Sequence, residues 1–171
     1  MRIIVLESGK TAQISRLEKG ILMKNLRSAS WDKSKVLILS GREIREMLRM
    51  DEVLEVVERS FKLEAEGKAI MPPKLYLNLP QYRGDFRAMP AYIDGVAGVK
   101  WVSSYPSNPS RNLRSVVATI ILCDPETSYP LAIMDGTYIT TLRTGATGGV
   151  AVKYLQRGFV CRWHDWGWCS G

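Results

Sequence analysis

The sequence predicts an α+β domain with two helices, a mostly antiparallel sheet and a long C-terminal helix, and three observations support this prediction. Residues 40–67 carry helical periodicity with capping residues at both ends. Residues 74–134 contain five short β-type runs separated by turn residues. Residues 137–155 return to a helical period. Because strands joined by short turns pair antiparallel, this order of elements is typical of an α+β domain.

The chain divides into three parts. Residues 1–35 mix short apolar runs with Lys, Arg and Ser, and we expect an N-terminal extension with one short strand and one helix. Residues 36–156 carry the regular patterns and form the predicted domain. Residues 157–171 differ in composition, because three of the five tryptophans lie between Trp163 and Trp168.

The domain begins with a predicted strand at Val36–Leu39 and two helices. Ser40 is followed three residues later by Glu43, which is the capping-box arrangement at a helix start. Asp51 is predicted to cap the second helix, and Gly67 is predicted to end it. The expected apolar stripe of this second helix comprises Val53, Leu54, Val57, Phe61 and Leu63.

Five strands follow a Met-Pro-Pro segment that cannot be helical. They are predicted at residues 74–79, 85–92, 96–105, 115–123 and 129–134. Gly, Pro, Asp and Asn supply the turns between them. The strand at 115–123 is apolar on both faces and therefore needs cover on both sides. The helix at 137–155 is predicted to place Leu142, Ala146, Val150 and Tyr154 along one side.

Four basic residues stand out in the stretch from the first of these strands to the last helix: Lys74, Arg87, Lys100 and Arg143. The first three fall inside apolar runs, where a cation is expensive to bury unless an anion meets it. Brought together, such cations would form a site for a carboxylate or a phosphate. For any one of them alone, the alternative is that the side chain reaches solvent from an edge strand.

Length and composition limit the classes of protein. A chain of 171 residues can bury one hydrophobic core, and none of its apolar runs is long enough to cross a bilayer. We therefore expect a cytoplasmic protein without a membrane partner. The net charge of +7 would allow nucleic-acid binding, but the sequence has no RNP-like motif, no zinc-finger spacing and no dense Lys/Arg run. We expect no nucleic-acid partner.

The three cysteines, Cys123, Cys161 and Cys169, are too few and odd in number for a disulfide framework. Cys161, His164 and Cys169 would make an incomplete set of metal ligands, so we expect no metal site.

Several stretches, in order and at their spacings, resemble the N-terminal domain of the ornithine cyclodeaminase/mu-crystallin family, and most of all its archaeal-type alanine dehydrogenase branch. They include M-P-P-K-L-Y-L, F-R-A-M-P-A-Y, G-V-K-W-V-S-S-Y-P-S-N-P and T-L-R-T-G-A-T-G-G-V. The resemblance implies that residues 36–156 bind the substrate and form a homodimer, and that a Rossmann domain with NAD completes the enzyme. It also implies a small amino acid or a 2-oxo acid as the substrate.

The resemblance implies a role for each cation. Lys74 stands where relatives have an Arg or Lys that helps to hold the substrate. Arg87 matches a residue that binds the substrate carboxylate, and Lys100 matches the lysine at the reacting carbon, which makes it the catalytic candidate. Arg143 matches an arginine near the substrate and the nicotinamide, so Arg143 and Thr144 are the cofactor-binding candidates.

The function implied for the whole protein is that of an NAD-dependent alanine dehydrogenase. Ornithine cyclodeaminase and ketimine reductase remain alternatives, as does a non-catalytic module for dimerisation or ligand binding. Two departures bear on this choice. Lys74 in place of Arg argues against an ornithine cyclodeaminase, and Leu113-Arg114-Ser115-Val116 stands where many relatives read Leu-Pro-Thr-Val.

The composition of the tail suggests a reading-frame error. The single tryptophan codon is TGG, and a shift of one base turns each tryptophan into glycine. Trp163, Trp166 and Trp168 then become glycines in a G-x-x-G-x-G spacing, which is compatible with the start of a dinucleotide-binding turn. We expect a truncated, frameshifted chain that lacks the Rossmann domain and is inactive alone.

Overall fold

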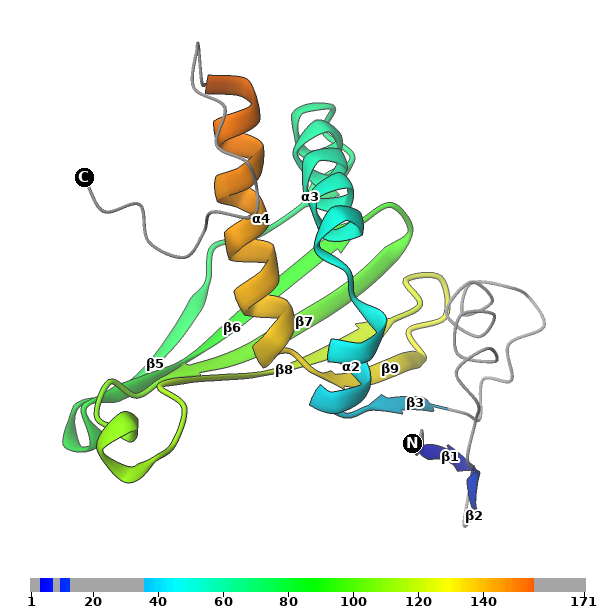
Figure 1. Cartoon of the computed structure of the whole chain (residues 1–171). Helices are drawn as coiled ribbons and strands as arrows, with labels where there is room; N and C mark the ends of the chain where they lie inside the picture. Colours follow the sequence, from blue (N-terminus) through cyan, green and yellow to red (C-terminus); the bar gives the residue numbers. More distant parts are fainter. Residues whose placement is uncertain (1–3, 8–9, 13–35, 156–171) are drawn as a thin grey trace.

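The computed structural model describes residues 4–7, 10–12 and 36–155 (Figure 1). Its strands are β1 Ile4–Glu7, β2 Lys10–Ala12, β3 Val36–Leu39, β4 Ala69–Ile70, β5 Leu75–Leu79, β6 Gly84–Ile93, β7 Val96–Ser104, β8 Val116–Cys123 and β9 Pro130–Asp135. Its helices are α2 Gly41–Met47, α3 Met50–Ala65 and α4 Thr137–Leu155, with short 3-10 helices at Pro80–Tyr82 and Asn108–Arg111. The predicted α+β class is confirmed.

All the described strands form one sheet in the order β2-β1-β3-β9-β8-β7-β6-β4, and β5 also pairs with β6. Neighbouring strands are antiparallel, except that β3 and β9 are parallel. Figure 1 shows α2, α3 and α4 on the same side of this sheet. All the helices of the described residues therefore lie on one face of the sheet.

Local sequence signals explain where α2 begins and α3 ends. At the start of α2, the backbone N–H of Ser40 donates to Glu43 Oε2 at 2.8 Å, and Glu43 N–H donates to Ser40 Oγ at 3.4 Å. This is the predicted capping box. At the end of α3, Gly67 takes a φ of +70°, and Lys68 N–H donates to the carbonyl of Leu63 at 2.8 Å. This pattern is a Schellman motif, in which glycine suits the left-handed position.

The prediction that Asp51 caps α3 is wrong. Arg49 is the N-cap residue, and Asp51 lies inside the first turn. The Asp51 carboxylate accepts hydrogen bonds from Arg49 Nε at 3.1 Å and Nη2 at 2.7 Å. A carboxylate in the first turn still interacts favourably with the helix dipole.

Helix α3 packs against α4, and the two lie side by side in Figure 1. Most of the predicted apolar stripe of α3 is partly buried, but Phe61 is 45% exposed. Glu58 joins the two helices, because its carboxylate accepts hydrogen bonds from Lys153 Nζ at 2.6 Å and from the Tyr154 hydroxyl at 2.5 Å. Lys62 Nζ donates to the same carboxylate at 3.0 Å.

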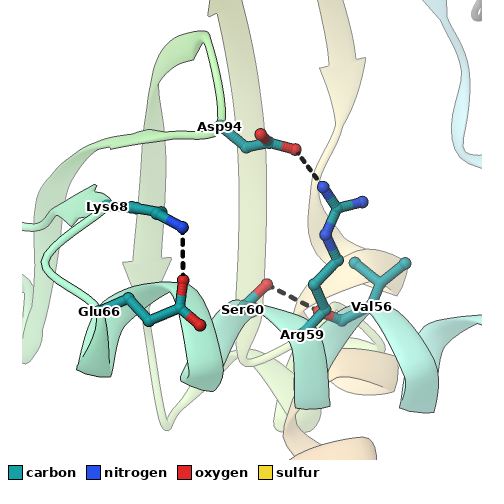
Figure 2. Close-up of polar contacts among 6 residues, drawn as sticks. All are labelled: Val56, Arg59, Ser60, Glu66, Lys68 and Asp94. Carbon is teal, nitrogen blue, oxygen red and sulfur yellow. Dashed lines mark hydrogen bonds and ion pairs between the residues drawn. The ribbon is translucent and has the colours of Figure 1, made fainter.

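A second contact ties α3 to the sheet, as Figure 2 shows. Arg59 Nη2 and Asp94 Oδ2 are 2.7 Å apart. Asp94 and Gly95 form the turn between β6 and β7, and both have positive φ angles, of 49° and 76°. Consecutive residues of this kind make the two-residue hairpin turn that matches the twist of the strands. Close by, Lys68 Nζ and Glu66 Oε2 are 2.7 Å apart.

The core lies where α2 and the start of α4 cover β3, β9 and β8. Its buried residues are Leu37, Leu39, Ile44, Leu131, Ala132 and Met134. Helix α4 is fixed at its start by two contacts: Thr137 N–H donates to Asp135 Oδ1 at 2.9 Å, and Ala118 N–H donates to Thr137 Oγ1 at 3.1 Å. Along α4, Ala146 and Val150 are buried as predicted, whereas Tyr154 is 61% exposed.

The other face of the sheet is apolar, and no helix of the described residues covers it. Trp101 lies between Lys100 and Val102 in β7, so its side chain is on this face. Its ring is 42% exposed and stacks on Phe86, with 5.4 Å between centroids and 15° between planes. Other exposed apolar side chains of this face are Leu75, Leu77 and Val117. No helix among the described residues could span a membrane.

Candidate functional site

Arg87 and Lys100 lie on the helix-bearing face of the sheet. Arg87 in β6 is opposite Val102 in β7, and Val102 is opposite Ala118 in β8. Directly opposite residues of antiparallel strands share a face, and so do residues two apart in one strand. Val102 and Ala118 are buried, and Ala118 bonds to Thr137 at the start of α4. Lys100, two residues before Val102, therefore shares this face with Arg87.

The strand register places Lys74 in line with Lys100 across the sheet. Leu75 is opposite Ala88, so continuing the register places Lys74 beside Met89. Met89 is in turn opposite Lys100. Lys74 itself is exposed, whereas Lys100 is half-buried. The predicted strand started at Lys74, and the observed β5 starts one residue later.

Arg143 reaches this cluster from α4. The pKa of Lys100 is lowered, first by burial, then by the positive charge of Arg143, and then by that of Lys74. Within the described residues none of these three side chains forms an ion pair. The fold therefore brings together three positive charges that have no ion-pair partner in the part of the chain that the structure describes. We call Lys74, Lys100 and Arg143 the cation cluster.

Arg87 differs from the cation cluster, because it has an anionic partner. Its Nε donates to Asp85 Oδ1 at 2.5 Å, and its Nη2 donates to Asp85 Oδ2 at 2.9 Å. The hydrogen bonds from Arg87 hold the pKa of Asp85 below its usual range. The guanidinium also lies over the ring of Tyr76, 5.3 Å from the centroid. Sequence reasoning missed Asp85 and Tyr76, although the D-x-R spacing in a strand places both charges on one face.

The cofactor candidates lie on α4, and both side chains are exposed. Arg143 has no ion-pair partner among the described residues, which suits a phosphate or a carboxylate. The Thr144 hydroxyl donates to the carbonyl of Thr140 at 2.8 Å, so its oxygen remains able to accept a hydrogen bond. The described ranges contain no glycine-rich turn that could hold a pyrophosphate.

No group of three or more His, Cys, Asp or Glu side chains that could hold a metal exists in the part of the chain that the structure describes. Cys161, His164 and Cys169 lie outside the described residues, as does the whole tail at 157–171. Cys123 is a free, partly buried thiol.

This arrangement suits a small anion with a reactive carbon. Three unpaired cations and a bidentate guanidinium can bind a carboxylate. A half-buried lysine beside other cations releases its proton more readily than a lysine in water, so it can transfer a proton near neutral pH more easily. Carboxylate binding and proton transfer are thus available on one face of the sheet.

Comparisons with known proteins point to one family. The sequence pattern of the ornithine cyclodeaminase/mu-crystallin family matches residues 34–158. An alanine dehydrogenase of Archaeoglobus fulgidus is 54% identical over 121 residues, which are 71% of this chain and 37% of that protein.

Solved structures agree with this match. An archaeal alanine dehydrogenase dimer with bound NAD superposes with a TM-score of 0.69 at 54% identity, over 71% of this chain and 38% of that one. A Thermococcus litoralis Δ1-pyrroline-2-carboxylate reductase in complex with NADH and L-proline gives 0.68 at 43% identity, over 70% of this chain and 38% of that one. The chain thus spans less than two fifths of the length of these relatives.

Proposed function

Because the chain belongs to the ornithine cyclodeaminase/mu-crystallin family, we propose that it is the substrate-binding part of an NAD-dependent alanine dehydrogenase, which converts L-alanine to pyruvate and ammonia. The observation that carries the proposal is the cation cluster beside Arg87 on the helix-bearing face. The 54% identity to an alanine dehydrogenase favours this substrate over others of the family.

The side chains have distinct proposed roles. Arg87, Lys74 and Arg143 bind the substrate carboxylate, since each is a cation that can donate hydrogen bonds to it. Lys100 moves a proton at the reacting carbon, because its lowered pKa makes its neutral form more accessible. The chemistry that NAD supplies when bound is the acceptance of a hydride from that carbon.

A second substrate class has specific support. A Δ1-pyrroline-2-carboxylate reductase is 43% identical over most of this chain, and the same cations would bind the carboxylate of a cyclic imino acid. Ornithine cyclodeaminase and ketimine reductase are further alternatives. Initial rates of the frame-restored protein with L-alanine, L-ornithine, L-proline and cyclic imines would separate them. If the frame-restored protein turned over none of these compounds, the assignment would be refuted.

We also propose that the tail at 157–171 is translated out of frame, on the basis of its tryptophan spacing. DNA sequence past the codon of Gly171 tests this proposal, since it predicts an open Rossmann-encoding frame in the shifted register. The 171-residue chain should then show no NADH-linked turnover, and the frame-restored protein should show it.

The proposed roles predict different kinetic effects in the frame-restored protein. R87A should raise KM for alanine, since a charge-assisted contact of this kind contributes on the order of 2–3 kcal/mol.

K100A should lower kcat by a factor of about 10²–10⁴, because bound substrate does not replace a missing proton-transfer group. The exposed Lys68, in the connection between α3 and β4, supplies the control: K68A should leave KM and kcat unchanged. A K100A enzyme with normal kcat and a raised KM would make Lys100 a carboxylate ligand instead.

We further propose a cytoplasmic homodimer. The free thiol of Cys123 supports a reducing compartment. The uncovered apolar face around Phe86 and Trp101 supports association of two copies, because exposed apolar sheet faces of this kind mark interaction sites. The similar archaeal alanine dehydrogenase is a dimer.

A further inference from the structure

Asp85 holds Arg87 by only one of the two edges that a guanidinium offers to a carboxylate. One edge consists of Nε and Nη2, and the other consists of Nη1 and Nη2 at the tip of the side chain. Asp85 occupies the first edge, with distances of 2.5 Å to Nε and 2.9 Å to Nη2. Within the described residues Nη1 of Arg87 donates no hydrogen bond. A second carboxylate can therefore bind at the tip while Asp85 stays in place.

One further contact restrains the guanidinium. Its central carbon lies over the ring of Tyr76, 5.3 Å from the centroid, and Tyr76 is directly opposite Arg87 in the register of β5 and β6. The Arg87 side chain is 33% exposed and the Asp85 side chain only 20% exposed, so the pair is partly shielded from water. An arginine held by a carboxylate on one edge and a ring on one face has few rotamers left, which lowers the entropic cost of binding.

Electrostatics explains why Arg87 needs this partner. Lys74, Lys100 and Arg143 lie on or over the same sheet face without ion pairs among the described residues. The groups that act on the charge of Arg87 are Asp85 and Tyr76, and the hydrogen bond to Asp85 is the largest cause of the raised pKa of the guanidinium. The Asp85 carboxylate offsets the charge of Arg87 and holds its side chain on this face.

We propose that Asp85 is a positioning residue, which holds Arg87 so that the Nη1–Nη2 edge is presented to the carboxylate of a small 2-oxo acid or amino acid. This proposal rests on the proposed carboxylate site. It differs from a competing arrangement in which the incoming carboxylate displaces Asp85 from Arg87. The two arrangements predict opposite effects when the negative charge of Asp85 is removed.

The test is a titration of the full 171-residue chain with pyruvate, followed by NMR through the Arg87 Nε–Hε resonance. In the wild-type chain this resonance should be visible before pyruvate is added and should persist at saturation, because Asp85 keeps its hold on Nε. D85N should broaden or shift it without ligand, and should weaken pyruvate binding about tenfold, since a misplaced binding group loses affinity steeply.

D94N is the matched control. It also removes one negative charge and one arginine partner, Arg59, but it does so at the β6–β7 turn. Asparagine also tolerates the positive φ of this position. D94N should leave pyruvate affinity and the Arg87 resonance unchanged. In an R87K background D85N should have no further effect, because lysine lacks the two-edged fork through which Asp85 acts.

The outcomes separate the two proposals. If the wild-type chain binds pyruvate and D85N binds it equally or more tightly, the role of Asp85 is refuted and the carboxylate site stands. The role of Asp85 is also refuted if D85N weakens pyruvate binding as much in the R87K chain as in the wild type. It is refuted as well if pyruvate abolishes the hydrogen bond from Arg87 Nε–Hε to Asp85. If the wild-type chain binds neither pyruvate nor acetate, the proposed site fails, and the recognition role of Asp85 fails with it.

Discussion

At the scale of single residues, the position of Lys100 lowers the stability of the domain. It is half-buried, it lies beside Arg143 and Lys74, and it has no anion among the described residues. Both burial and like charges disfavour its protonated form, which explains the lowered pKa. A residue that destabilises its own domain is typical of a functional site.

Replacing Lys100 with the uncharged Met should therefore stabilise the chain. We expect K100M to raise the free energy of unfolding by about 0.5–1 kcal/mol at pH 7. Because the pKa of Lys100 is lower in the folded state, the cost of its charge is fully present below that folded pKa. It disappears as the pH rises above the unfolded value of about 10.4. Urea unfolding at pH 7 measures the cost of the charge, and unfolding at about pH 11.5, roughly one unit above the unfolded pKa, measures its disappearance.

Lys62 provides the opposite case. Its hydrogen bond to Glu58 raises its pKa, so K62M should not stabilise the chain at pH 7. A K100M chain that is less stable than the wild type at pH 7 would show that the ammonium of Lys100 is not destabilising.

At the scale of elements, the contact between α3 and α4 depends on the Glu58 carboxylate. Hydrogen bonds from Lys153, then from Tyr154 and Lys62, lower its pKa to about 2. The carboxylate side chain is 17% exposed, and α3 has no fully buried residue. This polar contact therefore matters more than it would between helices with a large apolar interface.

Acid should loosen this contact. The pKa of Glu58 is depressed in the folded state, so its stabilising effect is fully present above the ordinary value of 4.5. It is lost as the pH falls toward about 2. We expect the amides of α3 to exchange faster with solvent at pH 3 than at pH 5, after correction for intrinsic rates. E58Q should already show fast exchange at pH 5, whereas E64Q, at an exposed position of α3, should not.

The ends of α2 and α3 and the short strand β4 show which element boundaries could be predicted from the sequence. The start of α2 and the end of α3 were predictable, because the capping box at Ser40 and the glycine at 67 act within a few residues. The start of α3 was not, since Arg49 competes for the Asp51 carboxylate. The two-residue strand β4 was missed because its pairing with β6 depends on contacts distant in sequence.

At the scale of the whole molecule, the sheet separates two chemically different surfaces. The cation cluster and Arg87 lie on the face that carries the helices, and the stacked Phe86 and Trp101 lie on the other. The sequence identified the four cations, but their meeting depends on strand register. Asp85 was overlooked because the D-x-R spacing places the two charges on one face but does not show that they form an ion pair.

The uncovered face predicts a measurable self-association. W101E should raise the dimer dissociation constant by at least about tenfold, because a central tryptophan often contributes about 2 kcal/mol or more to an interface. Sedimentation equilibrium of the 171-residue chain would measure this change. V56E is the charge-matched control, since Val56 is 62% exposed on α3 and belongs to the helix side. A wild-type chain that stays monomeric at high concentration would refute the dimer.

The parallel pairing of β3 with β9 has a consequence for synthesis on the ribosome. Leu37 in β3 is the register partner of Ala132 in β9. The first strand of the core can therefore pair with β9 only after β9 has been synthesised. While the nascent chain grows, β6, β7 and β8 can form hairpins with their immediate neighbours. Leu39 and Ile44 have no partner in β9 until residues 131–134 have emerged. Until then this apolar segment is open to chaperones and to misassociation, because delayed long-range pairing leaves apolar surface exposed.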